Sequence, residues 1–226
     1  MNSRSGIPLL LFATLFGWVG ALYAEPSIDD FERCRRTAVE AVERRHRDVK
    51  DLSVHFSQTT QPSTPDSAPQ HSSGRAVLAL PQQMRWHYES PEESLLVSDG
   101  ETLWLYDPAF NEVQRLPVGD EGHLAAGAAQ FLLGRSDLEA EFSIRASACD
   151  PDRAVLELLP RKAASYQRLT LGVVLPSGDI TWTELVDLLG NTTRLEFSNL
   201  SFNTKPGASL FSFEPPPGSK VIDLAP

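Results

Sequence analysis

The side chains that usually carry chemistry are scattered along this sequence. The five histidines stand singly, at His46, His55, His71, His87 and His123. None belongs to a metal-binding spacing such as HExxH, and there is no CxxC pair. The chain also lacks a GxSxG elbow, a GxGxxG motif and a P-loop. The residues therefore indicate neither an enzyme nor a metal site, and we expect no cofactor.

The two cysteines, Cys34 and Cys149, are far apart in the chain. In an oxidising compartment such a pair can form a disulfide, which would tie an N-terminal helix to a distant loop. Two free, half-buried thiols are the alternative. The sequence alone does not choose between them, because it does not show whether the two residues lie within bonding distance.

The unusual residues are apolar and aromatic. In MRWHYE, Met84, Trp86 and Tyr88 alternate with polar residues, so they share one face of a strand. Leu95 and Trp104 come from the next two expected strands, and Phe131 and Leu132 from an Ala-rich helical stretch over residues 123–135. An ordinary core is one interpretation of these residues. A ligand-binding hollow is the other, and we predict it from Met84, Trp86, Leu95, Trp104, Phe131 and Leu132.

The Asp99-Gly100 pair predicts a β-hairpin. We expect it to pair Leu95 with Trp104, Leu96 with Leu103 and Val97 with Thr102. One face then carries Leu95, Val97, Trp104 and Tyr106, and the other carries Leu96, Leu103 and Leu105. Both faces are apolar, whereas a strand with one wet face alternates. Something must therefore cover the second face, and we expect helices to do so.

The elements that would hold these residues are one amphipathic helix and many short strands. Residues 28–50 repeat apolar side chains at helical spacing behind Ser27, a good N-cap. About eleven strands follow at hairpin spacing, the last of them at residues 209–215, SLFSFEP. This pattern predicts an α+β fold: an unclosed, strongly curled antiparallel half-barrel, with two or three helices as a lid over an apolar cavity.

The N-terminus predicts export. Arg4 precedes the apolar run IPLLLFATLFGWVGALYA, which ends in small residues. We interpret residues 1–24 as a signal peptide and residues 25–226 as one domain, with an uncleaved membrane anchor as the alternative. The net charge is −10, which argues against binding to nucleic acid.

A family resemblance appears in the stretch PQQMRWHYESPEESLLVSDGETLWLYDP. It resembles the periplasmic outer-membrane lipoprotein carriers, the LolA family, which show an RP-x-x-[FL]-x-W pattern, a V-S-D-G hairpin and an LW-x-Y-[DN]-P end. The strand DLSVHFSQ and the tail FSFEPPPGSKVID resemble other parts of the same family. In this order, behind a signal peptide, the resemblance covers essentially the whole mature chain.

The resemblance implies a carrier that catalyses no reaction. Its partners would be acylated lipoproteins, an ATP-driven release complex of the inner membrane and a receptor at the outer membrane. It also implies a periplasmic location, and we expect a monomer. Two alternatives remain open: a lipid-sensing or envelope-stress module of the same fold that carries no cargo, and a secreted hydrolase with dispersed catalytic residues.

One position departs from the family pattern. The family has an arginine before the proline of its RP motif, and that arginine fastens the lid. Here the matching residue is Leu80, before Pro81. The resemblance therefore implies that another group fastens the lid or that the lid is looser, and Arg85 and His87 are candidates for the substitute.

Overall fold

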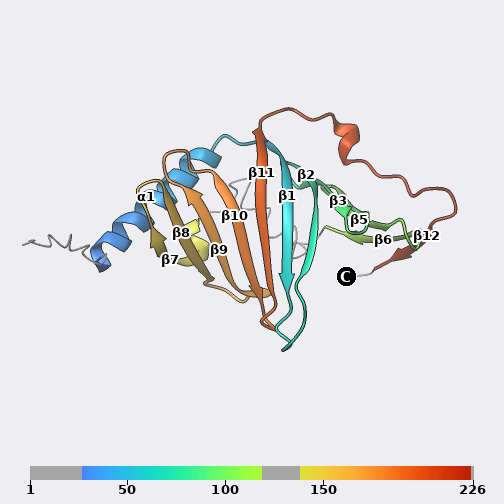
Figure 1. Ribbon diagram of the computed structural model, residues 1–226. Coiled ribbons are helices and arrows are strands. Elements are labelled where there is room, and N and C mark those ends of the chain that lie inside the picture. Colours follow the sequence, from blue (N-terminus) through green and yellow to red (C-terminus); the bar gives the residue numbers. More distant parts are fainter. Residues whose placement is uncertain (1–26, 119–137, 225–226) are drawn as a thin grey trace, which may run out of the picture.

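The computed structural model describes residues 27–118 and 138–224, which form one curled sheet with helices on it (Figure 1). The twelve strands follow the order β12-β6-β5-β4-β3-β2-β1-β11-β10-β9-β8-β7, so the two edge strands do not pair and the sheet is unclosed. All pairings are antiparallel except that of β12 with β6. The predicted half-barrel is confirmed, with one strand more than expected. The predicted helix at residues 123–135 lies outside the described residues.

The bounds of the elements are α1 (Ile28–His46), β1 (Asp51–Gln61), β2 (Gln70–Ala79), β3 (Gln83–Ser90), β4 (Ser94–Asp99), β5 (Thr102–Asp107), β6 (Glu112–Pro117), α3 (Leu138–Glu141), β7 (Phe142–Cys149), β8 (Arg153–Pro160), β9 (Tyr166–Val174), β10 (Ile180–Asp187), β11 (Thr192–Phe202), the 3-10 turn η2 (Ala208–Phe211) and β12 (Lys220–Asp223).

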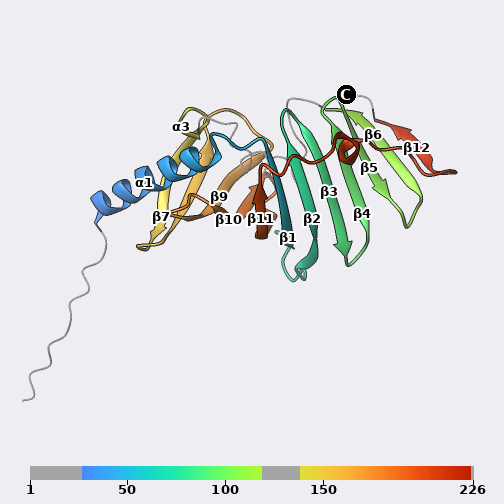
Figure 2. The ribbon, with the colours of Figure 1, turned by 90° about the horizontal axis from the view of Figure 1, so that it is seen from above.

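Helix α1 begins at a capping box. The Ser27 side chain accepts a hydrogen bond from the Asp30 N–H, and the Asp30 carboxylate accepts one from the Ser27 N–H. Hydrogen bonds from Ser27 lower the pKa of Asp30. The helix contacts β7, β8 and β9 and lies across them (Figure 2), with its apolar stripe buried. None of the helices within the described ranges is both long and apolar enough to cross a membrane.

Alternation along each strand gives the sheet an inner and an outer face. We call the inner face the one that shares a core with α1. In β3, Met84 and Trp86 belong to that core, whereas the intervening Arg85 donates a hydrogen bond to the Leu210 carbonyl of η2, 3.2 Å away. Segment 203–219, which contains η2, therefore covers the outer face of β3–β5, while α1 covers the inner face of β7–β9.

The hairpin at Asp99-Gly100 forms with a register that differs from the prediction. Leu95 pairs with Tyr106, Leu96 with Leu105 and Val97 with Trp104. The predicted pairs were wrong because the Asp99 carboxylate accepts hydrogen bonds from the N–H groups of Glu101 and Thr102, which makes a longer connection. The shift amounts to two residues, so the composition of the two faces is unchanged.

The strand predicted at residues 209–215 does not form. Ala208–Phe211 is the 3-10 turn η2, and Phe211 is buried against the outer face with only 2% of its surface exposed. The twelfth strand comes later, at Lys220–Asp223, and runs parallel to β6. The aromatic residues of this tail are thus not strand residues of the sheet but anchors of a segment that crosses it.

Candidate functional site

The inner face of β1 and β3 is a tight aromatic cluster. Trp86 is fully buried, with its ring centroid 4.5 Å from that of Phe56. Tyr88 meets Phe56 edge to face at 5.1 Å and donates a hydrogen bond to the Gln58 side chain, 3.0 Å away. Burial raises the pKa of Tyr88, so its hydroxyl stays neutral at physiological pH. This part of the face is therefore a closed apolar core without charge.

The inner face opens into a hollow at β4–β6. Its volume is about 300 Å³. Leu96 and Leu105, which pair across β4 and β5, form the apolar side of the hollow and are only half-buried. The exposed ring of Phe110 stands at its rim. The full lining is Ser94, Leu95, Leu96, Leu105, Tyr106, Asp107, Phe110, Glu112 and Gln114.

Strand parity places this hollow on the inner face. Most of its strand residues share the parity of Trp86, namely Ser94, Leu96, Leu105, Asp107, Glu112 and Gln114. Leu95 and Tyr106, which pair with each other and have the opposite parity, border it as well. The hollow is therefore continuous with the face that carries Met84 and Trp86. Half-buried leucines beside polar rim groups suit an amphipathic ligand with an apolar chain.

The predicted site residues do not all come together. Met84 and Trp86 lie on the inner face, and both are buried. Leu95 and Trp104 share a face with each other, as parity predicted, but it is the outer face. The Phe213 ring lies 6.3 Å from that of Trp104 and 5.7 Å from that of Tyr106. By strand parity, the side chains of Leu95 and Trp104 point away from the face that carries Met84 and Trp86. Leu95 nevertheless borders the hollow, whereas Trp104 does not.

The remaining predicted residues have different outcomes. Phe131 and Leu132 lie outside the described residues. Leu80 packs against the core, and its N–H donates to the Lys50 carbonyl at 2.9 Å. Neither Arg85, which bonds η2, nor His87, 2.9 Å from the Glu93 carboxylate, contacts α1 through a hydrogen bond or ion pair described here.

Helix α1 is fastened along its whole length. Cys34 and Cys149 are joined by a disulfide, with their Cα atoms 6.3 Å apart. Arg35 pairs with Glu139 of α3 at 2.6 Å. Near the other end, Arg45 pairs with Asp179 at 2.6 Å and stacks on the Phe202 ring, 4.0 Å from its centroid. In this chain, these contacts hold the helix against the sheet.

Sequence reasoning missed Leu96 and Leu105, although one signal could have found them. Trp86 pairs with Leu96 across β3 and β4, so an inward Trp86 implies an inward Leu96. That link needs the register of a second hairpin, which the Ser90–Ser94 connection does not reveal by its sequence. Phe211 and Phe213 were missed because their alternation resembles that of a strand.

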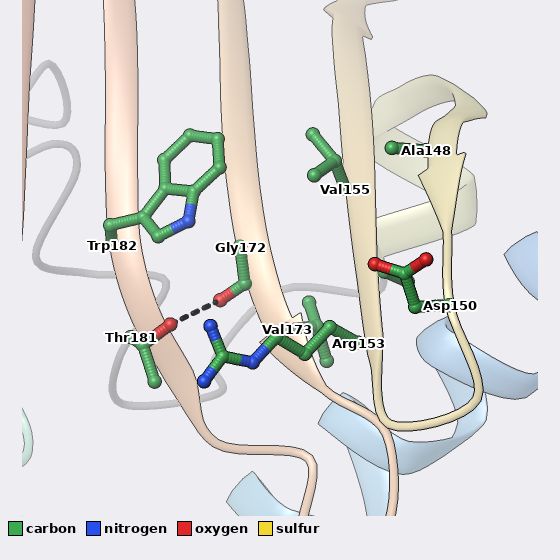
Figure 3. Close-up of a pocket in the computed structure, with 9 residues that line it drawn as sticks. Ala148, Asp150, Arg153, Val155, Gly172, Val173, Thr181 and Trp182 are labelled. Carbon is green, nitrogen blue, oxygen red and sulfur yellow. Dashed lines mark hydrogen bonds between the residues drawn. The ribbon is translucent and has the colours of Figure 1, made fainter.

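A second, smaller pocket lies on the outer face of β7–β10 (Figure 3). Its volume is about 200 Å³, with the Trp182 ring on one side and Val155 on another. Thr181 donates a hydrogen bond to the Gly172 carbonyl at 3.3 Å. This pocket is separated from the inner face by the sheet itself. Across residues 27–118 and 138–224, no three His, Cys, Asp or Glu side chains gather closely enough to hold a metal ion.

Comparison with known proteins identifies the family. The model of the family described as outer membrane lipoprotein carrier protein LolA matches residues 47–214. An outer-membrane lipoprotein carrier protein of Methylibium petroleiphilum is 38% identical over 77% of this chain and 84% of its own length. One from Dechloromonas aromatica is 32% identical over 78% of this chain and 83% of its own.

A solved structure shows a likeness of fold alone. An uncharacterized conserved protein from Thermus thermophilus superposes with a TM-score of 0.50 at 13% identity, over 84% of this chain and 98% of that one. The family match spans most of the chain and includes the inner-face strands, the hollow and the segment that covers the outer face. The chain therefore belongs to the outer membrane lipoprotein carrier protein LolA family.

Proposed function

We propose that this protein carries lipoproteins through the periplasm. It takes them from an ATP-driven release complex of the inner membrane, shields their acyl chains and hands them to a receptor at the outer membrane. Residues 1–24 act as the cleaved signal peptide. The names of its relatives support the cargo class. The observation that carries the proposal is the hollow on the inner face, where Leu96 and Leu105 are left half-buried beside a closed aromatic core.

The energetics explain why a carrier is needed. Burying a methylene group contributes about 0.8 kcal/mol, so an acyl chain of about sixteen carbons represents on the order of 12 kcal/mol. Such a chain does not leave a membrane unaided. A carrier must replace the bilayer and still release its load, which favours a hollow with a modest apolar area over a deep closed cavity.

The residues proposed to contact acyl chains are Leu96 and Leu105 at the hollow, with Met84 and Trp86 as the rigid floor behind them. Phe131 and Leu132 remain proposed lid residues. No step of this function requires bond making or breaking, and every role is one of binding. The polar rim, Ser94 and Gln114 among it, can face the water or the head of the cargo.

The test compares two adjacent residues of β5. Trp104 and Leu105 are both half-buried but point to opposite faces of the sheet, and of the two only Leu105 lines the hollow. We expect Leu105→Glu to lower the amount of triacylated lipopeptide that co-elutes with the protein at least ten-fold, because a buried carboxylate opposes apolar contact. Trp104→Glu should retain the lipopeptide within two-fold.

Thermal unfolding of both variants checks that each is folded. Equal lipopeptide binding by the two variants, both folded, would remove the hollow from the proposed site. Loss of binding by Trp104→Glu alone would move the site to the outer face.

A further inference from the structure

Two leucines stand out on the surface, in the turn between β10 and β11. Leu188 is 61% exposed and Leu189 is 80% exposed. Among the exposed large apolar residues in the described ranges, they are the only two adjacent in sequence. The turn and the β1–β2 loop lie together at one end of the sheet (Figure 1). A bare leucine pair is costly for a protein that moves through water, so its setting needs an explanation.

The turn holds these leucines outward by a rigid network. The Asp187 carboxylate accepts hydrogen bonds from the Leu189 N–H at 2.8 Å and from the N–H and side-chain amide of Asn191 at 2.9 and 2.7 Å. Gly190 adopts a positive φ of 86°, which lets the chain reverse. The leucines therefore do not fold back to hide their side chains.

Neighbouring elements brace the turn from two sides. Gln167 of β9 donates a hydrogen bond to the Leu188 carbonyl at 3.2 Å. The Ser63 N–H of the β1–β2 loop donates to the Asn191 side chain at 2.9 Å. The groups that brace the turn are thus neutral, and its one carboxylate, Asp187, is occupied inside it. A partner that contacts the two leucines would therefore meet no unpaired charged group of this turn.

The strand pairings place the hollow at the same rim as the leucines. Gln61 pairs with Thr192, Tyr88 with Ser94 and Asp107 with Glu112, so these strand ends all belong to one rim of the sheet. Ser94, Asp107 and Glu112 line the hollow, and Phe110 follows in the β5–β6 loop, 79% exposed.

The opposite rim is different in character. Its hairpin loops carry Asp99, Glu101, Asp150, Asp152 and Asp179 and, within the described residues, none of the exposed large apolar side chains.

From this asymmetry we infer that the Leu188-Leu189 turn is a lipid-contact tip, which inserts into the interface of a zwitterionic bilayer and brings the open end of the hollow to the membrane. A convex tip with two aliphatic side chains needs no complementary pocket, and a fluid bilayer supplies none. The loops of this rim carry both signs of charge, with Asp66, Glu92 and Glu93 on one hand and Arg161 and Lys162 on the other. The net charge of the whole chain is −10, so an anionic surface would repel the protein and a zwitterionic one would not. The tip would bind the membrane weakly and for a short time, because two leucine side chains bury little apolar area.

The experiment measures co-sedimentation of the mature protein with phosphatidylcholine vesicles at several millimolar lipid. We expect a bound fraction that changes by less than two-fold between about 50 and 500 mM salt, since the contact is apolar. The double variant Leu188→Ser/Leu189→Ser should bind at least five-fold less. Leu159→Ser, which changes an exposed leucine on β8, is the matched control and should bind like the unaltered protein.

Three results would overturn the inference: equal vesicle binding by the double variant and the unaltered protein, loss of binding in both leucine variants, or binding that salt abolishes. The inference does not depend on the proposed cargo. Lipopeptide binding in solution should be unchanged in the double variant. If the unaltered protein fails to bind lipopeptide, that result contradicts the proposed function but not the lipid-contact tip.

Discussion

Gly172 shows how one residue shapes the outer surface. It lies in the interior of β9 and pairs with Trp182 of β10. A Cβ added there would lie 2.0 Å from the Trp182 indole nitrogen, so the indole occupies space that any other residue would need. On the other side, the Arg194 guanidinium stacks on the same ring, 4.0 Å from its centroid. The glycine is therefore required for this packing and not for a turn.

Gly172→Ala should lower the free energy of unfolding by about 1–3 kcal/mol, because Trp182 must leave its position. Urea unfolding measures the change. Trp182→Ala in the same background should recover part of the loss, and the two substitutions should couple by about 1 kcal/mol or more. Strictly additive effects would show that the clash between the two side chains does not set the cost.

Asp187 links the leucine turn to pH. The hydrogen bond from the Asn191 side chain, followed by backbone N–H groups, lowers the pKa of Asp187 below its ordinary value of 3.8. Its stabilising effect is therefore present above that value and is lost as the pH falls through the lowered pKa. We expect the urea midpoint to decline below about pH 4 more steeply in the unaltered protein than in Asp187→Asn. Parallel pH profiles would contradict this role.

At the residue scale, the sequence predicted the faces better than the contacts. Alternation correctly placed Leu95 on the same face as Trp104, and Met84 on the same face as Trp86, because side chains of a strand repeat every two residues. It could not decide whether the two pairs share a face, since that depends on the register between β3 and β4. The hollow at Leu96 and Leu105 follows only once that register is known.

At the scale of elements, the cover of the sheet is divided between two segments. Helix α1 covers the inner face of β7–β9, and the C-terminal segment with η2 covers the outer face of β3 and β4. The helix was predictable from its cap and its apolar stripe. The C-terminal cover was not, because SLFSFEP alternates like a strand while its Pro-rich continuation keeps it out of the sheet.

The disulfide is the covalent part of the α1 attachment, and it joins cysteines 115 residues apart. We expect Cys34→Ser to lower the free energy of unfolding by about 4–5 kcal/mol, as expected for a loop of this length. Urea unfolding under non-reducing conditions measures it. Cys149→Ser and the double variant should show the same loss, because each breaks the same bond. A double variant much less stable than either single one would mean that the thiols contribute separately.

At the scale of the molecule, the two rims of the sheet differ. Within the described residues, the hairpin loops of one rim carry carboxylates and no exposed large apolar side chain. The loops of the other rim carry charges of both signs together with the leucine turn, Phe110 and the open end of the hollow. Composition predicted an acidic chain but not this division, because it arises from which loops fall at which rim. The order of the strands in the sheet decides at which rim each loop lies. The sequence predicted only that the strands follow one another at hairpin spacing.

The central pairing of β1 with β11 sets the order in which the molecule can assemble. Most neighbouring strands are joined by hairpins, but within the described sheet Gln61 meets Thr192 only after nearly all of the chain is present. Strands β1–β6 can pair locally while one side of β1 still exposes its backbone N–H and C=O groups. The nascent chain must keep that bare edge from pairing with other strands until its last long strand has been made. The completion of the sheet thus waits for its most distant pairing, and this delay follows from the topology rather than from any single residue.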